Sequence, residues 1–265
     1  MDFLSIFTDN FGSIILVLSL MAFFGLVFAV LIYIGFTLFR YRGREEKAVD
    51  GVLYQISVPR DNEIKIDAAE QMIAALSSIK KGGFWQRFSI QDVLSFEVVA
   101  RPEEIRFYIW TPKRLADLVE KQVHGAYPDA EVLQVSEEEI YKPIFSSNGK
   151  VAFSSLQLRG AAYYPIKTYK DLPTDPLSLL TAALAKMGAG EAAAIQILIS
   201  PSESDWRGAG RGFISQTKKS ESDPEKASYK VDAKALEAIE NKLGKPGFET
   251  IIRIVTIAPE IEAAK

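Results

Sequence analysis

The stretch VPRDNE, Val58 to Glu63, places four polar side chains between a strand-like and a helix-like run. Such side chains can bind an ion, polarise a substrate or contact a partner protein. A catalytic site would also need a nucleophile, a set of metal ligands or a glycine-rich loop, and the neighbouring sequence supplies none of these. The stretch therefore predicts an interaction loop made of Arg60, Asp61, Asn62 and Glu63.

A second candidate is the segment WRGAGRGF, Trp206 to Phe213, in which two arginines alternate with three glycines. Guanidinium groups and backbone amides could together hold an anion. The segment lacks the GxGxxG spacing of a dinucleotide site, and SSNGKVAF, around Lys150, lacks the first glycine and the hydroxyl residue of a phosphate loop. Arg207 and Arg211 are predicted as an anion contact; the alternative is a flexible or closely packed surface segment.

Composition excludes several kinds of chemistry. The chain of 265 residues has no cysteine and one histidine, which excludes thiolate zinc sites, cysteine nucleophiles and clusters of histidine ligands. His124 falls at the end of a predicted helix, where a cation meets the partial negative charge of the last carbonyls. No catalytic residue, metal site or cofactor is predicted, and the chain is not expected to be an enzyme. An unrecognised hydrolase is the remaining enzymatic alternative.

The first 44 residues are predicted to be a transmembrane anchor. Residues 13–39 carry no charge, and this run exceeds the length of about 20 residues that crosses a bilayer. Asp2 and Asp9 precede the run, which is not the pattern of a signal peptide. The arginines that follow it place the N-terminus outside and the rest of the chain in the cytoplasm. They are predicted to flank the anchor and to contact anionic lipid: Arg40, Arg42 and Arg44.

Residues 51–136 are predicted to form a first small α/β unit. Asp67 stands three residues before Glu70, the spacing of a helix-capping pair. Apolar periodicity and turn residues give the following elements: strand 52–58, helix 67–79, strands 93–100 and 105–110, helix 111–125 and strand 131–135. The order β-α-β-β-α-β is that of a ferredoxin-like unit.

A linker rich in Glu, Ser, Asn and Gly, residues 137–150, separates this unit from a second one at 151–259. Strands are predicted at 151–159, 193–200 and 248–258, with helices between them. The fold class predicted from the sequence is therefore α+β: one N-terminal transmembrane helix followed by two small α/β sandwich units, of which the first is ferredoxin-like.

Three stretches together resemble a known group of proteins: QISVPRDNEIKIDAAEQMIAALSSI, DVLSFEVVARPEEIRFYIWTPKRLADLVEKQVHGAYPDAEV and KPGFETIIRIVTIAP. They resemble a family of poorly characterised bacterial membrane proteins, similar to the membrane-attached region associated with conjugative coupling-type ATPases of type IV secretion systems. The resemblance covers residues 51–259 and is strongest in the first unit. It implies a scaffold beside an FtsK/HerA-like motor. No catalytic residue is carried over, because the motor domain with its phosphate loop would begin after Lys265.

The predicted function is thus that of a non-catalytic assembly subunit in the bacterial inner membrane, which positions a separate P-loop motor ATPase. Its expected partners are membrane lipid, that ATPase and further copies of itself. Nucleic acid is expected only indirectly, because the formal net charge is −3. The rival prediction is a membrane-tethered module that binds a nucleotide or a lipid head group through the Arg-Gly segment.

Overall fold

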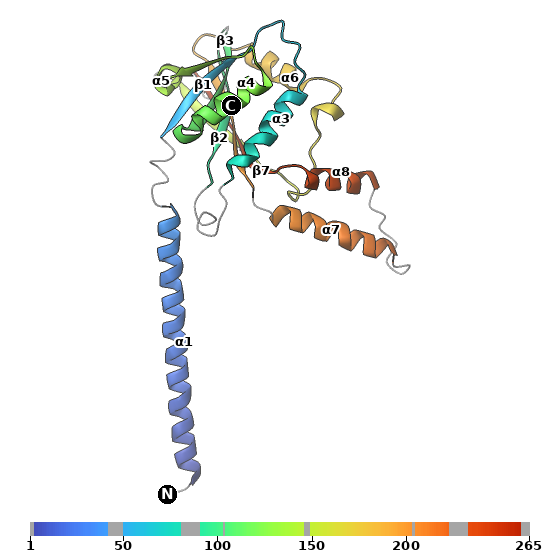
Figure 1. Cartoon of the computed structure of the whole chain (residues 1–265). Helices are drawn as coiled ribbons and strands as arrows, with labels where there is room; N and C mark the ends of the chain where they lie inside the picture. The colour runs from blue at the N-terminus through green and yellow to red at the C-terminus, as the bar shows by residue number, and fades with distance from the viewer. Residues whose placement is uncertain are drawn as a thin grey trace. The chain divides into compact units, whose positions relative to one another are not determined.

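The computed structural model describes residues 3–41, 50–80, 91–102, 104–145, 149–202, 205–222 and 233–260. Helix α1, Phe3–Tyr41, and the α+β domain that follows it are two separate units, and each is described by itself (Figure 1). The part of α1 from Ser13 to Phe39 is 27 residues long and contains an 18-residue window with a mean hydropathy of 3.0. By length and composition, this helix can cross a membrane once.

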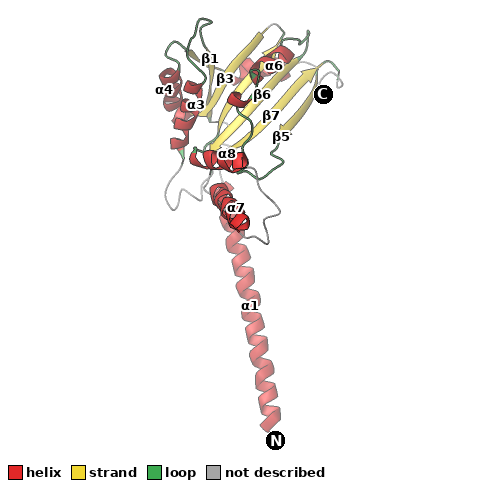
Figure 2. Ribbon diagram, turned by 90° about the vertical axis from the view of Figure 1, so that its right-hand side faces the viewer, coloured by secondary structure: helices red, strands yellow, loops and turns green. Residues whose placement is uncertain are grey.

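The α+β domain is built on one antiparallel sheet of seven strands (Figure 2). Their order across the sheet is β4-β1-β3-β2-β6-β7-β5. Every neighbouring pair runs antiparallel. The strands are β1 Gly51–Ser57, β2 Leu94–Arg101, β3 Glu104–Pro112, β4 Glu131–Val135, β5 Lys150–Leu156, β6 Ala192–Pro201 and β7 Phe248–Ala258.

Helices cover the sheet unevenly. The α-helices of the domain are α3 Asp67–Ala75, α4 Ala116–Ala126, α5 Glu137–Phe145, α6 Pro176–Leu184, α7 Asp205–Ser222 and α8 Ala233–Gly244. Short 3-10 turns are η1 Leu76–Ile79, η3 Lys113–Leu115 and η4 Tyr169–Asp171. One face of the sheet carries α3, α4 and α6, the other carries α5, and α7 and α8 pack on each other in a cluster of their own.

The main core lies between the sheet and the pair α3 and α4. Alternation along the strands turns one set of apolar side chains toward these helices, as expected for a half-covered sheet. The apolar stripe predicted for the helix after β3 is present, because Leu115, Val119 and Val123 are all buried in this core. Leu76 and Leu94 are 1% and 0% exposed and mark its centre.

The structure contains the predicted β-α-β-β-α-β order but corrects the prediction of two small sandwiches. Strands β4, β1, β3 and β2 come from the first predicted unit and lie side by side. Strand β6 of the second predicted unit pairs with β2, from Leu94 opposite Ile199 to Ala100 opposite Ala193. The two segments therefore share a single sheet. Periodicity along the chain predicts strands but not which distant strands pair, so this joint was missed.

The segment 137–150, predicted as a linker, contains helix α5 instead. Ile140 is 8% exposed and packs against the face of the sheet that α3 and α4 leave open. Trp110 of β3 donates a hydrogen bond from Nε1 to Glu137 Oε1 at 2.7 Å, and Arg101 donates to the carbonyl of Ile140. Acidic residues in the first turn also suit the positive end of a helix.

Candidate functional site

The predicted interaction loop is one exposed turn between β1 and α3. The amide of Asn62 donates to the carbonyl of Pro59 at 3.2 Å, and Asn62 Oδ1 accepts from the amide of Ile64 at 3.3 Å. Asn62 therefore shapes the turn. For Arg60, Asp61 and Glu63 no hydrogen bond or ion pair is found within the described part of the chain, and all three are exposed. The structure brings the four predicted residues together on the surface.

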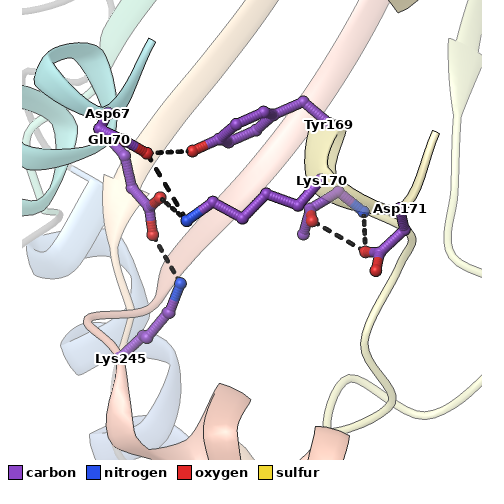
Figure 3. Close-up of polar contacts among 7 residues, drawn as sticks. Asp67, Glu70, Tyr169, Lys170, Asp171 and Lys245 are labelled. Carbon is purple, nitrogen blue, oxygen red and sulfur yellow. Dashed lines mark hydrogen bonds and ion pairs between the residues drawn. The ribbon is translucent and has the colours of Figure 1, made fainter. Parts of the chain in front are cut away.

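The start of α3 holds a polar cluster that the sequence did not predict (Figure 3). Tyr169 of η4 donates a hydrogen bond to Asp67 Oδ1. Lys170 Nζ lies 3.6 Å from Asp67 Oδ1 and 3.7 Å from Glu70 Oε2. Lys245, after α8, lies with Nζ 2.5 Å from Glu70 Oε1. The cluster therefore joins three segments that are far apart in sequence.

The same contacts explain why the predicted capping pair Asp67–Glu70 does not form. The residue that caps α3 is Ile66, which has helical backbone angles, and no side chain caps the helix. The hydrogen bond from Tyr169, aided by the charge of Lys170, lowers the pKa of Asp67. The hydrogen bond and charge of Lys245 lower the pKa of Glu70. Because these side chains are 40–61% exposed, the cluster orients its segments more than it stabilises them.

The predicted anion contact lies on α7, which is one continuous helix despite three glycines. Arg207 and Arg211, one turn apart, line an open groove of about 1030 Å³ between α7 and α8. Lys218 and Lys219 line it two turns further along, and among its described lining residues Glu240 is the carboxylate. We call this surface the α7 groove. The sequence left residues 206–217 ambiguous, because Trp206 and Phe213 favour a helix that the glycines weaken.

Two of the four cations in the α7 groove are held by the protein. Arg207 Nη2 donates to the carbonyl of Lys245 at 2.6 Å, and its guanidinium lies 5.2 Å from the ring of Trp206. Lys218 Nζ lies 2.8 Å from Glu240 Oε1. Arg211 and Lys219 are exposed, and within the described residues no partner is found for either. The groove thus combines fixed and available positive charge.

The predicted arginine flank of the anchor cannot be placed in the structure. Arg40 is part of α1, but its side chain lies outside the description. Arg42 and Arg44 lie outside the described residues altogether. Their role as an anchor flank stays a prediction from the sequence.

A buried acid, Glu97, lies in the middle of β2 and is 5% exposed. Gln196 of β6 donates from Nε2 to Glu97 Oε1 at 3.1 Å, and Tyr141 of α5 donates to Oε2. Burial raises the pKa of Glu97 to about 7 and outweighs the hydrogen bonds that lower it. Perturbed acids of this kind occur at functional sites, but they also occur in structural networks. Here the acid and its partners fasten α5 to the sheet.

Strand β5 forms an open, apolar edge of the sheet. It pairs with β7 on one side, and Phe153, the residue opposite Val255, is 86% exposed. Val151 is 47% exposed, and Ile251 of β7, which shares their face by strand alternation, is 49% exposed. Sheet edges are usually shielded by charge, and exposed apolar patches mark contact surfaces. We call these three residues the β5 edge.

Of the sites that the sequence did not predict, Glu97 has a recognisable signal in the sequence, whereas the β5 edge and the cluster at Asp67 do not. A lone glutamate at an alternating position of the apolar run LSFEVVA points to Glu97, since a charge there needs partners. The β5 edge has no such signal, because exposure of Phe153 depends on what fails to cover it. The cluster at Asp67 depends on long-range placement of η4 and cannot be read from local spacing.

The fold and these surfaces define a helix-bearing α+β protein that combines an open sheet edge with a cationic groove. The chain matches the family described as Domain of unknown function (DUF8128) over residues 44–265 and belongs to that family. No curated protein matches the chain.

Proposed function

We propose that this protein is a non-catalytic, single-pass membrane scaffold of a bacterial type IV secretion-like or DNA-transfer machine, where it positions a separate P-loop motor ATPase. Two things support the proposal. One is the resemblance of the cytoplasmic sequence to regions associated with coupling-type ATPases. The other, which carries it structurally, is the β5 edge.

The β5 edge supports a scaffold because it offers two kinds of contact at once. The backbone groups on the outer side of β5 can accept an added strand from a partner, which gives affinity through main-chain hydrogen bonds. Phe153, with 86% of its surface exposed, supplies an apolar anchor beside them. The partner proposed for this edge is the motor ATPase, and nucleic acid meets the machine through that motor.

Helix α1 is proposed to fix the chain in the bacterial inner membrane, with the N-terminus outside and the α+β domain in the cytoplasm. The support is the apolar stretch Ser13–Phe39 together with the arginines that follow it. The exposed loop Arg60–Glu63 is proposed as a second, charged contact with the same machine. Its place on the surface leaves these side chains accessible to a partner.

The test is a mild-detergent purification of the full-length protein from its native membrane, followed by mass spectrometry of the bound proteins. Phe153→Lys is expected to lower recovery of a coupling-type P-loop ATPase at least about tenfold, as removal of an interface anchor does. Because Phe153 is so exposed, the variant should fold normally.

The matched control is Leu133→Lys, which places the same charge on β4, the opposite edge strand, at a residue 45% exposed. It is expected to keep the ATPase bound. If the ATPase is present in the starting membrane but never accompanies the unchanged protein, the scaffold proposal is wrong. If Phe153→Lys instead removes further copies of this chain and leaves the ATPase bound, the edge serves self-assembly and the motor contact lies elsewhere.

A further inference from the structure

We propose that the α7 groove binds the phosphate groups of anionic phospholipids in the membrane that anchors the chain. The inference rests on the membrane anchor but not on the motor partner. Its starting point is the lining of the groove, where four cations face one carboxylate among the described residues. Such a surface attracts phosphate, and guanidinium groups bind phosphate oxygens in pairs.

The four cations are spread along the length of α7 and do not surround an enclosed cavity. Arg207, Arg211 and Lys218 lie on one side of α7, because spacings of four and seven residues approximate whole turns, and Lys219 lies about 100° further round the helix. At 1.5 Å per residue the row is about 18 Å long. Nucleotide sites are usually enclosed and lined by apolar side chains, whereas this groove is open along the helix. A row of charges on an open surface suits a layer of head groups.

The groove is also ready to bind. Arg207 is already oriented by the carbonyl of Lys245 and by the ring of Trp206, so little side-chain freedom remains to be lost. Arg211 and Lys219 are exposed and have no partner within the described residues. Phosphate groups would supply the partners for these two side chains.

The glycines of α7 fit the same interpretation. A Cβ at Gly210 would lie 2.8 Å from Leu243 Cδ2, so packing of α8 explains this glycine. A Cβ at Gly208 or Gly212 would meet no atom within 4 Å. Packing therefore does not explain these two glycines, each of which costs helix stability. Because these two glycines have no side chain, the backbone of α7 could come close to the lipid head groups beside the arginines.

The anchor makes a membrane surface permanently available. Helix α1 ends at Tyr41 and β1 begins at Gly51, so the connecting chain spans at most about 35 Å. Lysine and arginine near an anionic bilayer are attracted within about a Debye length. Because the chain as a whole carries a formal charge of −3, general attraction to the membrane is not expected, and the groove would select the orientation of the domain.

The chain has no cysteine, so one introduced thiol can report on the groove in the full-length protein. Ser215→Cys places a fluorescent label in the groove lining, and Ser154→Cys on β5 serves as the label control. The protein is reconstituted in nanodiscs of neutral phosphatidylcholine, with or without phosphatidylglycerol, that carry a nitroxide quencher on the head groups. Quenching at position 215 is expected to rise about threefold with the anionic lipid and to fall again in high salt.

The charge test uses Arg211→Glu combined with Lys219→Glu, which should abolish the rise. The matched control, Arg159→Glu with Lys186→Glu, changes the net charge equally at exposed residues outside the groove and should preserve it. The proposal is overturned if the rise is absent, or if the control pair removes it as well. It is also overturned if inorganic phosphate or ATP changes the label signal in neutral nanodiscs, since the ligand would then be a soluble phosphate.

Discussion

At the scale of single residues, Glu97 is the one charged side chain found buried among the described residues of the domain. A carboxyl group that is 5% exposed is ionised only against the cost of burial, which is why its pKa rises from 4.5 to about 7. Below pH 4.5 the acid is protonated in both the folded and the unfolded chain. As the pH rises from 4.5 to about 7, the unfolded chain loses this proton before the folded chain does. The folded chain therefore becomes less stable relative to the unfolded chain over this range of pH.

Glu97→Gln should remove this pH dependence, because the amide keeps the shape and cannot ionise. The difference in unfolding free energy between variant and unchanged protein is expected to shift by about 3 kcal/mol in favour of the variant between pH 4.5 and pH 7. Thermal unfolding of the full chain in detergent, followed by tryptophan fluorescence, measures the shift.

The control for this experiment is Glu249→Gln on β7, which makes the same substitution at an exposed residue. A flat difference between Glu97→Gln and the unchanged protein across the window would mean that Glu97 is hydrated and not buried as described.

Residues also show where sequence reasoning stops. The spacing of Asp67 and Glu70 predicts a helix cap, yet both carboxylates bind side chains from η4 and from the turn after α8. A local pattern competes with partners that only the tertiary fold supplies. The loop Arg60–Glu63 is exposed on the surface, and its role as an interaction loop stays a prediction.

At the scale of elements, α7 allows a direct comparison of three glycines in one helix. Gly208→Ala and Gly212→Ala have free space for a methyl group and should each stabilise α7 by about 0.5 to 1 kcal/mol. Hydrogen exchange of the α7 amides in the full-length protein should slow about two- to fivefold if they exchange by local opening.

Gly210→Ala should have the opposite effect and speed exchange, because its methyl group would lie 2.8 Å from Leu243 Cδ2 and 3.0 Å from Tyr163 Cβ. Equal responses from all three positions would contradict the packing of α8 against α7. If the stabilised variants also lose the lipid-dependent quenching, the two open glycines are needed for approach to the membrane.

The elements between residues 51 and 136 were predictable from the sequence, whereas helix α5 and the pairing of β6 with β2 were not. The strands and helices between residues 51 and 136 follow clear periods of two and 3.6, and their order is observed. Helix α5 was missed because three consecutive glutamates indicate a solvated segment, whereas Ile140 beside them is buried. Pairing of β6 with β2 was missed because it joins residues about 100 positions apart, and no local signal specifies such pairs.

At the scale of the whole molecule, the orientation of α1 can be tested with the same cysteine-free background. A membrane-impermeant maleimide should label Ser5→Cys in intact spheroplasts and Ser220→Cys only after lysis, since the arginines after the apolar stretch favour the cytoplasmic side. Labelling of the unchanged chain, which has no thiol, gives the background. The reverse labelling pattern would put the α+β domain outside and rule out a cytoplasmic motor as its partner.

The position of β1 in the sheet has a mechanical consequence. The chain that leaves α1 enters the domain at β1, which pairs with β3 on one side and with β4 on the other. A pull along this strand acts across hydrogen bonds that lie perpendicular to it, so both ladders resist together. Tension that reaches the domain along β1 would therefore be carried in shear, with the load shared by the hydrogen bonds of both ladders.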